Sequence, residues 1–461
     1  MDVTGLTSLT RITHAALHAA MPTKDDLAVA APADSGRRPT AYAWFITAML
    51  VLLMLINWGD KSVLGLAAVP ISEEFGLSHT QYGFISSSFF FLFSISSAVV
   101  GMLALRVKTR WILLVIAIAW SVCQLPIVIP MGVTGLLVSR IALGVTEGPT
   151  SSLTVHTAHD WFPPSRRGVP TALTQLGGGL GLAVAAPTLT FLIVRFGWKS
   201  AFAALAIIGI VWAVVWLFVA KDGPYSAAAT PAADAERETG GPAVWRVFTT
   251  RTWWGGFVLG FAAYWALSLI SAWLPTYLEK DAGYAAGTVG TLLIVPPLVG
   301  VVAQLGATLL SDRLVRRGVA SKYARGVLVG VIGLVSGICV VAFPHAGSPP
   351  VAMTLLAIGL GAPGMAFPLG QLVAAEITPV RKRTAVLGWT VGLVTSAGLV
   401  APAVTGAMVD AAATPHQGYV NVWTLTGVLL IVAAVLAIFT IDPARDAARL
   451  GTAKSTNRSI A

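Results

Sequence analysis

The chain has 461 residues, of which 56% are hydrophobic and only 11% carry an Asp, Glu, Lys or Arg side chain. The formal net charge of +10 would favour nucleic-acid binding in a soluble protein, but here the apolar residues occur in runs of about twenty, the length that spans a bilayer. The composition therefore excludes a soluble globular domain and predicts an all-α, multi-pass integral membrane protein without a nucleic-acid partner.

The first segment in chain order, residues 1–40, holds scattered basic residues but no uninterrupted apolar core. It is predicted to be a disordered cytoplasmic tail rather than a cleaved secretory signal. Each of the twelve apolar runs that follow is predicted to be a transmembrane helix. The runs cover residues 42–68, 81–105, 111–129, 133–157, 168–194, 199–220, 253–278, 287–311, 325–344, 351–375, 384–409 and 419–441.

A hydrophilic stretch rich in Ala, Pro, Glu and Arg, residues 221–252, divides the twelve predicted helices into two sets of six. The predicted organisation is thus a six-helix bundle over 41–220, a cytoplasmic linker over 221–252, a second six-helix bundle over 253–441 and a cytoplasmic tail over 442–461.

Basic residues gather in the loops on one predicted side of the membrane. They are Arg106, Lys108, Arg110, Arg166, Arg167, Arg313, Arg316, Arg317, Arg381, Lys382 and Arg383. The opposite loops hold little more than Arg195, Lys199 and Lys280. The positive-inside rule therefore predicts that both termini are cytoplasmic in a protein of the cell membrane.

Four ionisable side chains lie inside two predicted helices: Asp60 and Lys61 in the first, and Arg140 and Glu147 in the fourth. At about 1.5 Å of rise per residue, Asp60 lies about 24 Å from the cytoplasmic end of its helix, and Arg140 lies about 10 Å from the outer end of the oppositely directed helix four. Asp60 and Arg140 are therefore expected at similar depth and able to pair. Glu147 lies about 10 Å deeper, where a lone carboxylate is expected to bind a proton.

A charge at bilayer depth costs about 2.5–3.5 kcal/mol, so these side chains need partners and usually a task. We hypothesise that Lys61 and Arg140 attract an anionic substrate, while Asp60 and Glu147 take up and release the coupling proton. Ionised Glu147 would pair with Arg140, and protonated Glu147 would leave Arg140 free for the anion, whose binding favours rocking of one bundle against the other. The alternative is a static buried network that only orders the bundle.

An internal repeat supports the division into two halves. A basic loop follows helix two at Arg106, Lys108 and Arg110, and a similar loop follows helix eight at Asp312, Arg313, Arg316 and Arg317. The two copies are separated by roughly two hundred residues, about half of the membrane region, as in a duplicated transporter.

The second loop resembles the signature G-x-L-x-D-R-x-x-R-R of the major facilitator superfamily, with one residue inserted. The first copy departs from it, because Leu105 stands where an acidic residue is expected. The resemblance implies that these loops gate the cytoplasmic side by pairing charges. The alternative is that the cations only fix the topology. The expected gating residues are Gly306, Asp312, Arg313, Arg316, Arg317, Arg106 and Arg110.

Four further stretches resemble the anion:cation symporter family of this superfamily, which includes bacterial proton-coupled sugar-acid permeases and animal sialic acid and vesicular glutamate carriers. They are NWGDKSVLGLA from Asn57, RIALGVTEGP from Arg140, WFPPSRRG from Trp161 and WLPTYL from Trp273. The resemblance implies that Asp60 and Glu147 are protonatable and that Lys61 contacts a substrate carboxylate. The family commonly has Arg at that position, and Lys offers a point charge instead of a two-pronged donor.

Weaker candidates come from the same resemblance. Phe93, Gln175, Trp389, Thr395 and Ser396 fall where the family lines its cavity, and each is equally well explained by helix packing. The family often has Tyr and Asn at the positions of Phe93 and Thr395. The cavity is therefore expected to have fewer polar groups and to suit a less hydroxylated acid, aromatic acids included.

The glycine run that contains Gly177 and Gly181 lies inside an apolar helix, so it predicts close helix contact rather than a phosphate-binding loop. No metal-ligand pair, nucleophile elbow or nucleotide-binding loop occurs, so we expect neither an enzyme nor a cofactor. Cys123 and Cys339 lie in different halves, which argues against a disulfide.

The sequence therefore predicts a monomeric secondary transporter that takes up a small organic anion with a proton. The alternatives are an efflux or exchange carrier of the same fold and, more remotely, a membrane sensor that does not transport.

Overall fold

The computed structural model describes residues 40–104, 107–128, 132–163, 166–226, 244–379 and 382–451. Residues 43–461 form one compact unit, and residues 1–42 are assigned to another, of which only 40–42 are described. The larger unit is helical throughout its described ranges, with no strand in them. The predicted fold class, a two-bundle helical membrane protein, is confirmed.

In the described ranges, the first half contains nine α-helices, of which two pairs each form one span. They are α3 (Ala41–Leu66), α4 (Ala68–Phe75), α5 (His79–Ser88) with α6 (Phe93–Leu103), α7 (Thr109–Val128), α8 (Gly132–Glu147) with α9 (Thr150–His159), α10 (Gly168–Phe196) and α11 (Trp198–Val219).

The second half begins with the single turn α12 (Val244–Val247) and repeats the pattern. Its elements are α13 (Arg251–Ala272), α14 (Leu274–Thr276), the π-helical turn η4 (Tyr277–Asp281), α15 (Ala286–Leu292), α16 (Val295–Arg316), η5 (Lys322–Val327), α17 (Leu328–Ala342), η6 (Phe343–His345), α18 (Pro349–Gly361), η7 (Ala362–Met365), α19 (Ala366–Glu376), α20 (Arg383–Thr395), α21 (Ala397–Ala411), α22 (Pro415–Thr440) and α23 (Pro443–Leu450).

Within these ranges, nine helices are long and apolar enough to cross a membrane. The other predicted spans are α7, whose apolar part is Thr109–Leu125, and two spans that a turn divides, α5–α6 and α8–α9. The two divided spans cross each other closely. A Cβ atom at Gly144 or Gly148 would collide with the main-chain oxygen of Phe89 or Phe93, respectively. These two glycines, four residues apart, thus let the two backbones come into contact. Glu147 lies between the two glycines in the sequence, so the crossing sets its position.

The predicted contact through Gly177 and Gly181 is also confirmed. A Cβ atom at Gly177 would lie 3.0 Å from the main-chain oxygen of Val51, and one at Gly181 would lie 2.8 Å from Cβ of Trp58. Because both neighbours belong to α3, the glycine run brings α10 directly against the helix that carries Asp60 and Lys61.

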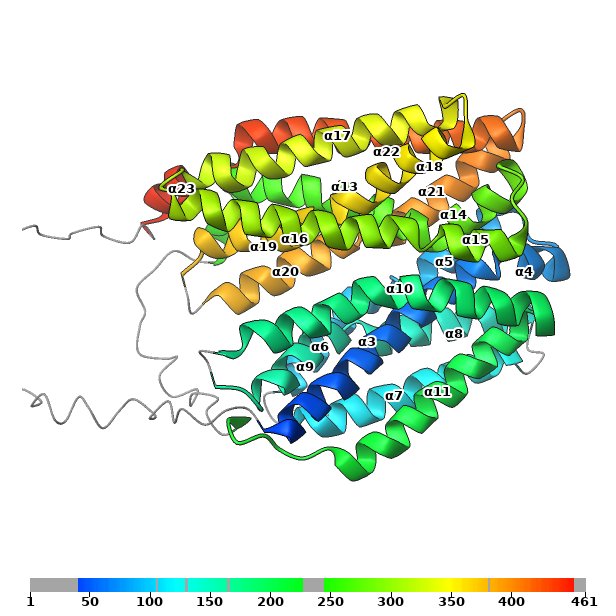
Figure 1. Ribbon diagram of the computed structural model, residues 1–461, viewed down its shortest axis with the longest axis horizontal. Coiled ribbons are helices and arrows are strands. Elements are labelled where there is room, and N and C mark those ends of the chain that lie inside the picture. The colour runs from blue at the N-terminus through cyan, green and yellow to red at the C-terminus, as the bar shows by residue number, and fades with distance from the viewer. Residues whose placement is uncertain are drawn as a thin grey trace, which may run out of the picture. The chain divides into compact units, whose positions relative to one another are not determined.

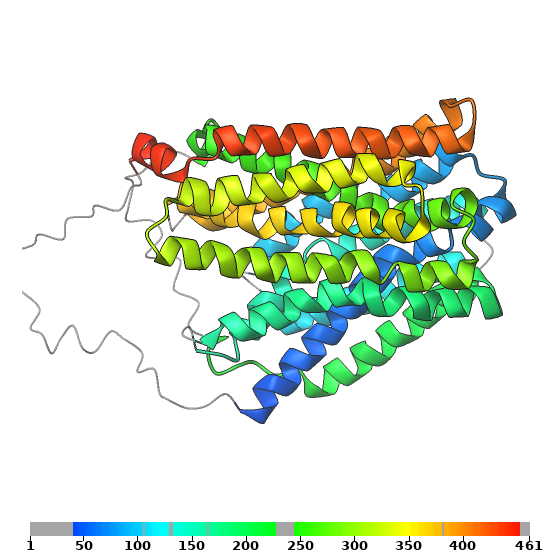
Figure 2. The same cartoon turned by 45° about the horizontal axis from the view of Figure 1, so that its top comes forward.

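The helices of the two halves form separate groups that meet at the end holding α4, α5, α14 and α15 (Figures 1 and 2). We call this the outer end, because the predicted topology places it away from the cytoplasm. There the Tyr82 hydroxyl lies 3.1 Å from the main-chain oxygens of Leu64 and Ala272, and Lys280 pairs with Glu73 at 2.7 Å. The outer end is therefore closed by contacts between the halves.

Asp410, at the end of α21, makes the densest of these contacts. One carboxylate oxygen accepts from the Thr80 main-chain nitrogen and hydroxyl, both at 2.7 Å. The other lies 2.7 Å from His79 Nδ1 and 3.2 Å from its main-chain nitrogen. An acid of one half thus caps the amino terminus of α5 in the other half.

The first prediction concerns this cap. Replacing Asp410 by Ala is expected to open the outer end, because loss of a helix cap costs about 1–2 kcal/mol and here the cap joins the two halves. The outward-open population should rise about fivefold to thirtyfold. Double electron–electron resonance between spin labels at Arg195 and Gln417, one on each half, measures that population.

Asp281→Ala is the matched control, because Asp281 also lies at the outer end but pairs within its own half, with His416 at 3.0 Å. An unchanged distance distribution in Asp410→Ala would show that the cap does not hold the halves together.

A second acidic cap lies at the other end of the molecule. Asp446 of α23 is buried and accepts from the main-chain nitrogen of Thr252, at the start of α13, at 2.9 Å. Burial alone would raise the pKa of Asp446, but hydrogen bonds from Arg445 and Thr252 outweigh it and leave that pKa lowered. The predicted tail from residue 442 thus begins with an anchored helix. Of the predicted linker over 221–252, residues 227–243 lie outside the described ranges.

Candidate functional site

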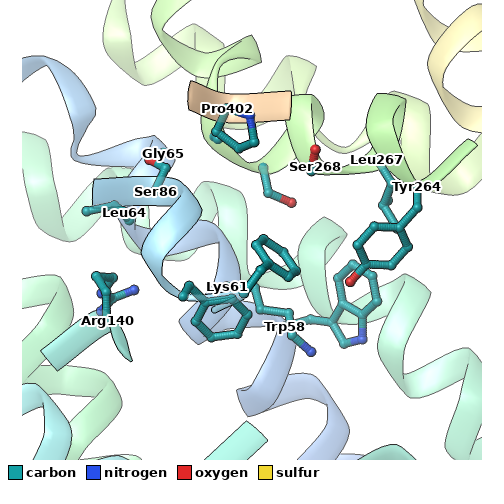
Figure 3. A pocket seen from close by; sticks show the side chains of 14 residues that line it. Trp58, Lys61, Leu64, Gly65, Ser86, Arg140, Tyr264, Leu267, Ser268 and Pro402 are labelled. Carbon is teal, nitrogen blue, oxygen red and sulfur yellow. The ribbon is translucent and has the colours of Figure 1, made fainter. Parts of the chain in front are cut away.

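A cavity that is partly open to solvent lies between the two halves. The first half supplies Trp58, Lys61, Leu64, Gly65, Ser86, Phe89, Phe90 and Arg140, and the second half supplies Tyr264, Leu267, Ser268, Ser271, Ala272 and Pro402. Figure 3 shows Lys61, Trp58, Tyr264 and Ser268 among the side chains around this space.

Three polar residues of the site come from one turn of α3. Asn57, Asp60 and Lys61 are spaced three and four residues apart, so they lie near one another on the helix surface. Asn57 and Asp60 are 1% and 2% exposed, and the Lys61 side chain is 15% exposed where it reaches the cavity. Lys61 is therefore the member of this turn that a ligand can touch.

Lys61 is held by four neighbours. Its Nζ donates to Asn57 Oδ1 at 2.6 Å and lies 3.4 Å from Glu147 Oε2. The same ammonium lies 5.1 Å from the centre of the Trp58 ring and 5.4 Å from that of Phe93. Aromatic faces and a carboxylate together stabilise the cation away from bulk water.

Glu147 completes this group. Its Oε2 accepts from Asn57 Nδ2 at 2.9 Å, while its buried Oε1 has no hydrogen-bond partner in the described ranges. Glu147 therefore does not stand alone, as the sequence had suggested, because α3 presents Lys61 and Asn57 to its carboxylate. In this structure the Arg140 guanidinium contacts Gln124 and the main chain of Asp60 instead, and the pairing of ionised Glu147 with Arg140 stays a prediction.

The second group links Asp60 to Arg140 through Gln124 of α7. Gln124 Nε2 donates to Asp60 Oδ1 at 2.8 Å, and Arg140 donates to Gln124 Oε1 at 3.3 Å. Arg140 also lies 3.4 Å from the main-chain oxygen of Asp60. The expected similar depth of Asp60 and Arg140 is confirmed, but the hydrogen bonds between them run through an amide and a main-chain oxygen.

All four ionisable groups are thus partnered in one buried cluster, in which Asp60, Arg140 and Glu147 are at most 2% exposed. When every member is ionised, two carboxylates balance two cations. Balance matters because an unpaired buried charge costs several kcal/mol. The cluster is able to hold one additional anion at little electrostatic cost once one carboxylate is protonated.

The weaker candidates lie in several places. Phe93 contacts Lys61 as described. Gln175 accepts from Ser151 at 3.1 Å on an exposed face, and Trp389 is 65% exposed on α20. Thr395 and Ser396 donate to main-chain oxygens of their own helix. The last four do not line the cavity described above, and their contact with substrate stays a prediction.

The expected gating residues have no contact between the halves in the part of the chain that the structure describes. Asp312, Arg313, Arg316 and Arg317, around the end of α16, make no side-chain hydrogen bond or ion pair there, and Gly306 borders open space. Arg110 instead lies 3.3 Å from Asp222 of its own half, and Arg106 is outside the described ranges. Their gating role stays a prediction.

Sequence reasoning missed the roles of Gln124, Asn57, Trp58 and Tyr264. Asn57 and Lys61 are one helical turn apart, a spacing that could have pointed to their contact. Gln124 is a polar amide within the apolar run of α7, which was a visible signal. Tyr264 comes from the second half, and no local pattern places it opposite Lys61.

Comparison with known proteins gives consistent matches. The family model of the Major Facilitator Superfamily matches residues 50–361. A hexuronate transporter of Bacillus subtilis is 28% identical over 410 residues, which covers 86% of this chain and 93% of that protein. A D-galactonate transporter of Escherichia coli O6:H1 is 25% identical over 415 residues, which covers 85% and 95%.

Solved structures show the same fold. A bacterial homologue of the human lysosomal transporter Spinster, in an inward-facing and unoccupied conformation, superposes with a TM-score of 0.71 at 17% identity and covers 89% of this chain and 98% of that chain. The likeness extends across both halves.

Proposed function

Because this chain belongs to the major facilitator superfamily, we propose that it is a proton-coupled symporter that takes up a small organic anion by alternating access. It is a multi-pass membrane transporter and not an enzyme. The observation that carries the proposal is the buried, charge-balanced cluster whose two cations, Lys61 and Arg140, border a cavity between the halves.

The balance of charge supplies the coupling. With Asp60 and Glu147 both ionised, the cluster is neutral and attracts an anion weakly. A proton on either carboxylate leaves one positive charge in excess, which an organic monoanion in the cavity neutralises. Proton and anion therefore favour each other's binding, as linkage requires of a symporter.

The class of substrate rests on the cavity and on the relatives. Two cations suit a carboxylate, and two similar proteins are transporters of hexuronate and D-galactonate. Among the described residues, the lining adds the aromatic rings of Trp58, Phe89, Phe90 and Tyr264 and three serines, but no carboxamide or carboxylate side chain to bind many hydroxyls. We therefore propose a carboxylic acid with fewer hydroxyl groups than those sugar acids.

Alternating access fits the contacts between the halves. In the described ranges, the ion pairs that join the halves lie at the outer end: Lys280 with Glu73 and His79 with Asp410. A molecule that is closed there and has no charge pair around Asp312 within the described ranges corresponds to an inward-facing state, in which the substrate and proton leave toward the cytoplasm.

Uptake into proteoliposomes tests the function. Purified protein is given radiolabelled D-glucuronate, D-galactonate or benzoate, with a pH gradient that is alkaline inside. We expect accumulation of at least one acid, and we expect a protonophore to collapse it. Liposomes without protein are the control. Exchange without gradient-driven accumulation would instead indicate an exchange carrier, and export toward the acidic side would indicate efflux.

A further inference from the structure

Gln124 lies between Asp60 and Arg140, two ionisable residues of the cluster. It is 1% exposed in α7, and both ends of its side-chain amide are engaged, the nitrogen with Asp60 and the oxygen with Arg140. An amide nitrogen only donates and an amide oxygen only accepts. The orientation of Gln124 therefore depends on what its two neighbours offer.

Arg140 has hydrogen-bonding capacity to spare. A guanidinium carries five N–H donors, but its Nε has no partner in the described ranges, although the side chain is 1% exposed and borders the cavity. Its guanidinium lies over the Phe202 ring at 5.4 Å, directed toward Gln124 and the main chain of Asp60. Gln124 thus holds part of a cation that an anion in the cavity would otherwise bind.

We propose that Gln124 is a positioning residue that links the proton on Asp60 to the availability of Arg140; this rests on the proposed symport function. Ionised Asp60 accepts from the amide nitrogen, as observed. A proton bound to Oδ1, the oxygen that accepts from Gln124, makes that oxygen a donor that faces another donor at the amide nitrogen. The amide then turns by half a rotation, and its oxygen accepts from Asp60.

The turn changes the other contact as well. The amide nitrogen now faces Arg140, and two donors form no hydrogen bond. Arg140 loses this partner and turns its N–H groups to a carboxylate in the cavity. Loss of the proton reverses each step, so no other reactant is needed.

Other charges act on Asp60. Arg140 and Glu147 face it from α8, Lys61 from α3 and Cys123 from α7, and Tyr82 of α5 faces Arg140. Glu147 and Lys61 act on Asp60 through their charges but make no contact with Gln124. A variant of Gln124 therefore keeps both carboxylates and loses the hydrogen-bonded link between Asp60 and Arg140.

Infrared difference spectroscopy of the substrate-free protein tests the turn directly. Spectra at acidic and alkaline pH are compared with glutamine side chains carrying ¹³C. We expect a glutamine carbonyl band to shift at the same pH midpoint as a carboxylic acid band. The first band should vanish in Gln124→Met and both in Asp60→Asn. A carboxylic acid band that titrates without a glutamine band, or neither band, would overturn the proposal.

Transport gives the second readout. In Gln124→Met, Arg140 lacks its amide partner at every pH, so the ratio of D-glucuronate uptake at acidic to alkaline pH should fall about tenfold relative to wild type. Gln417→Met, the same change at the exposed outer end, should leave the ratio unchanged. The infrared result decides the turn even if no substrate is transported, so its failure is distinct from failure of the symport function.

Discussion

Replacing Glu147 by Gln is expected to abolish accumulation driven by a pH gradient while leaving exchange of substrate across the membrane. Gln has the shape of a protonated Glu, so it keeps the contact with Asn57 at the Oε2 position but releases no proton. One proton per monoanion supports about tenfold accumulation per pH unit, or about 1.36 kcal/mol. The variant should accumulate nothing above equilibrium.

The measurement compares gradient-driven uptake with counterflow in the same proteoliposomes. Counterflow preloads unlabelled substrate and needs no net proton movement, so it reports whether the variant still binds and rocks. Glu147→Asp is the matched control, because it keeps a titratable carboxyl on the same helix face. Undiminished accumulation in Glu147→Gln would remove Glu147 from the coupling mechanism.

Replacing Lys61 by Met is expected to weaken substrate binding about tenfold to hundredfold. The change removes one of the two cations that border the cavity, the one that lies 3.4 Å from Glu147. A charge-assisted hydrogen bond contributes about 1.5–3 kcal/mol, which gives that range of affinity. The remaining cluster would have two carboxylates and one cation, so it would repel an anion while both carboxylates are ionised and carry a positive charge only when both are protonated.

Binding is measured as the shift in thermal unfolding with increasing carboxylate, together with initial uptake rates. Lys61→Arg is the informative control. It keeps the charge but presents two parallel donors, so binding should survive with a changed order of preference among carboxylates. Equal affinity in Lys61→Met and wild type would show that Lys61 is a packing residue, and a monodisperse elution profile excludes misfolding as the cause of a loss.

Much of the fold could be predicted because the amino-acid composition of a segment shows whether it can span a membrane. Runs of apolar residues show the twelve spans, and the contact of Gly177 and Gly181 with α3 followed from small residues at helical spacing. The turns that divide α5–α6 and α8–α9 were missed. They lie where Gly144 and Gly148 meet Phe89 and Phe93, and a contact between two spans has no local signal in either.

The sequence was sufficient to predict which ionisable residues form the candidate site and how deep they lie in the membrane. Asp60, Lys61, Arg140 and Glu147 stand out as charges within apolar runs, and helical rise alone placed Asp60 level with Arg140. Their partners were not predictable in the same way. Glu147 contacts Lys61 and Asn57 rather than Arg140, and Arg140 reaches Asp60 with the help of Gln124.

The sequence by itself determined the membrane class, the number of spans and the height of each charge, because composition and the rise per residue act along one helix at a time. Only the tertiary structure decided which charge meets which. That choice depends on how α3, α7 and α8 are rotated about their axes. The rotation is set by packing across both halves, and hydrogen bonds depend on differences of less than an ångström.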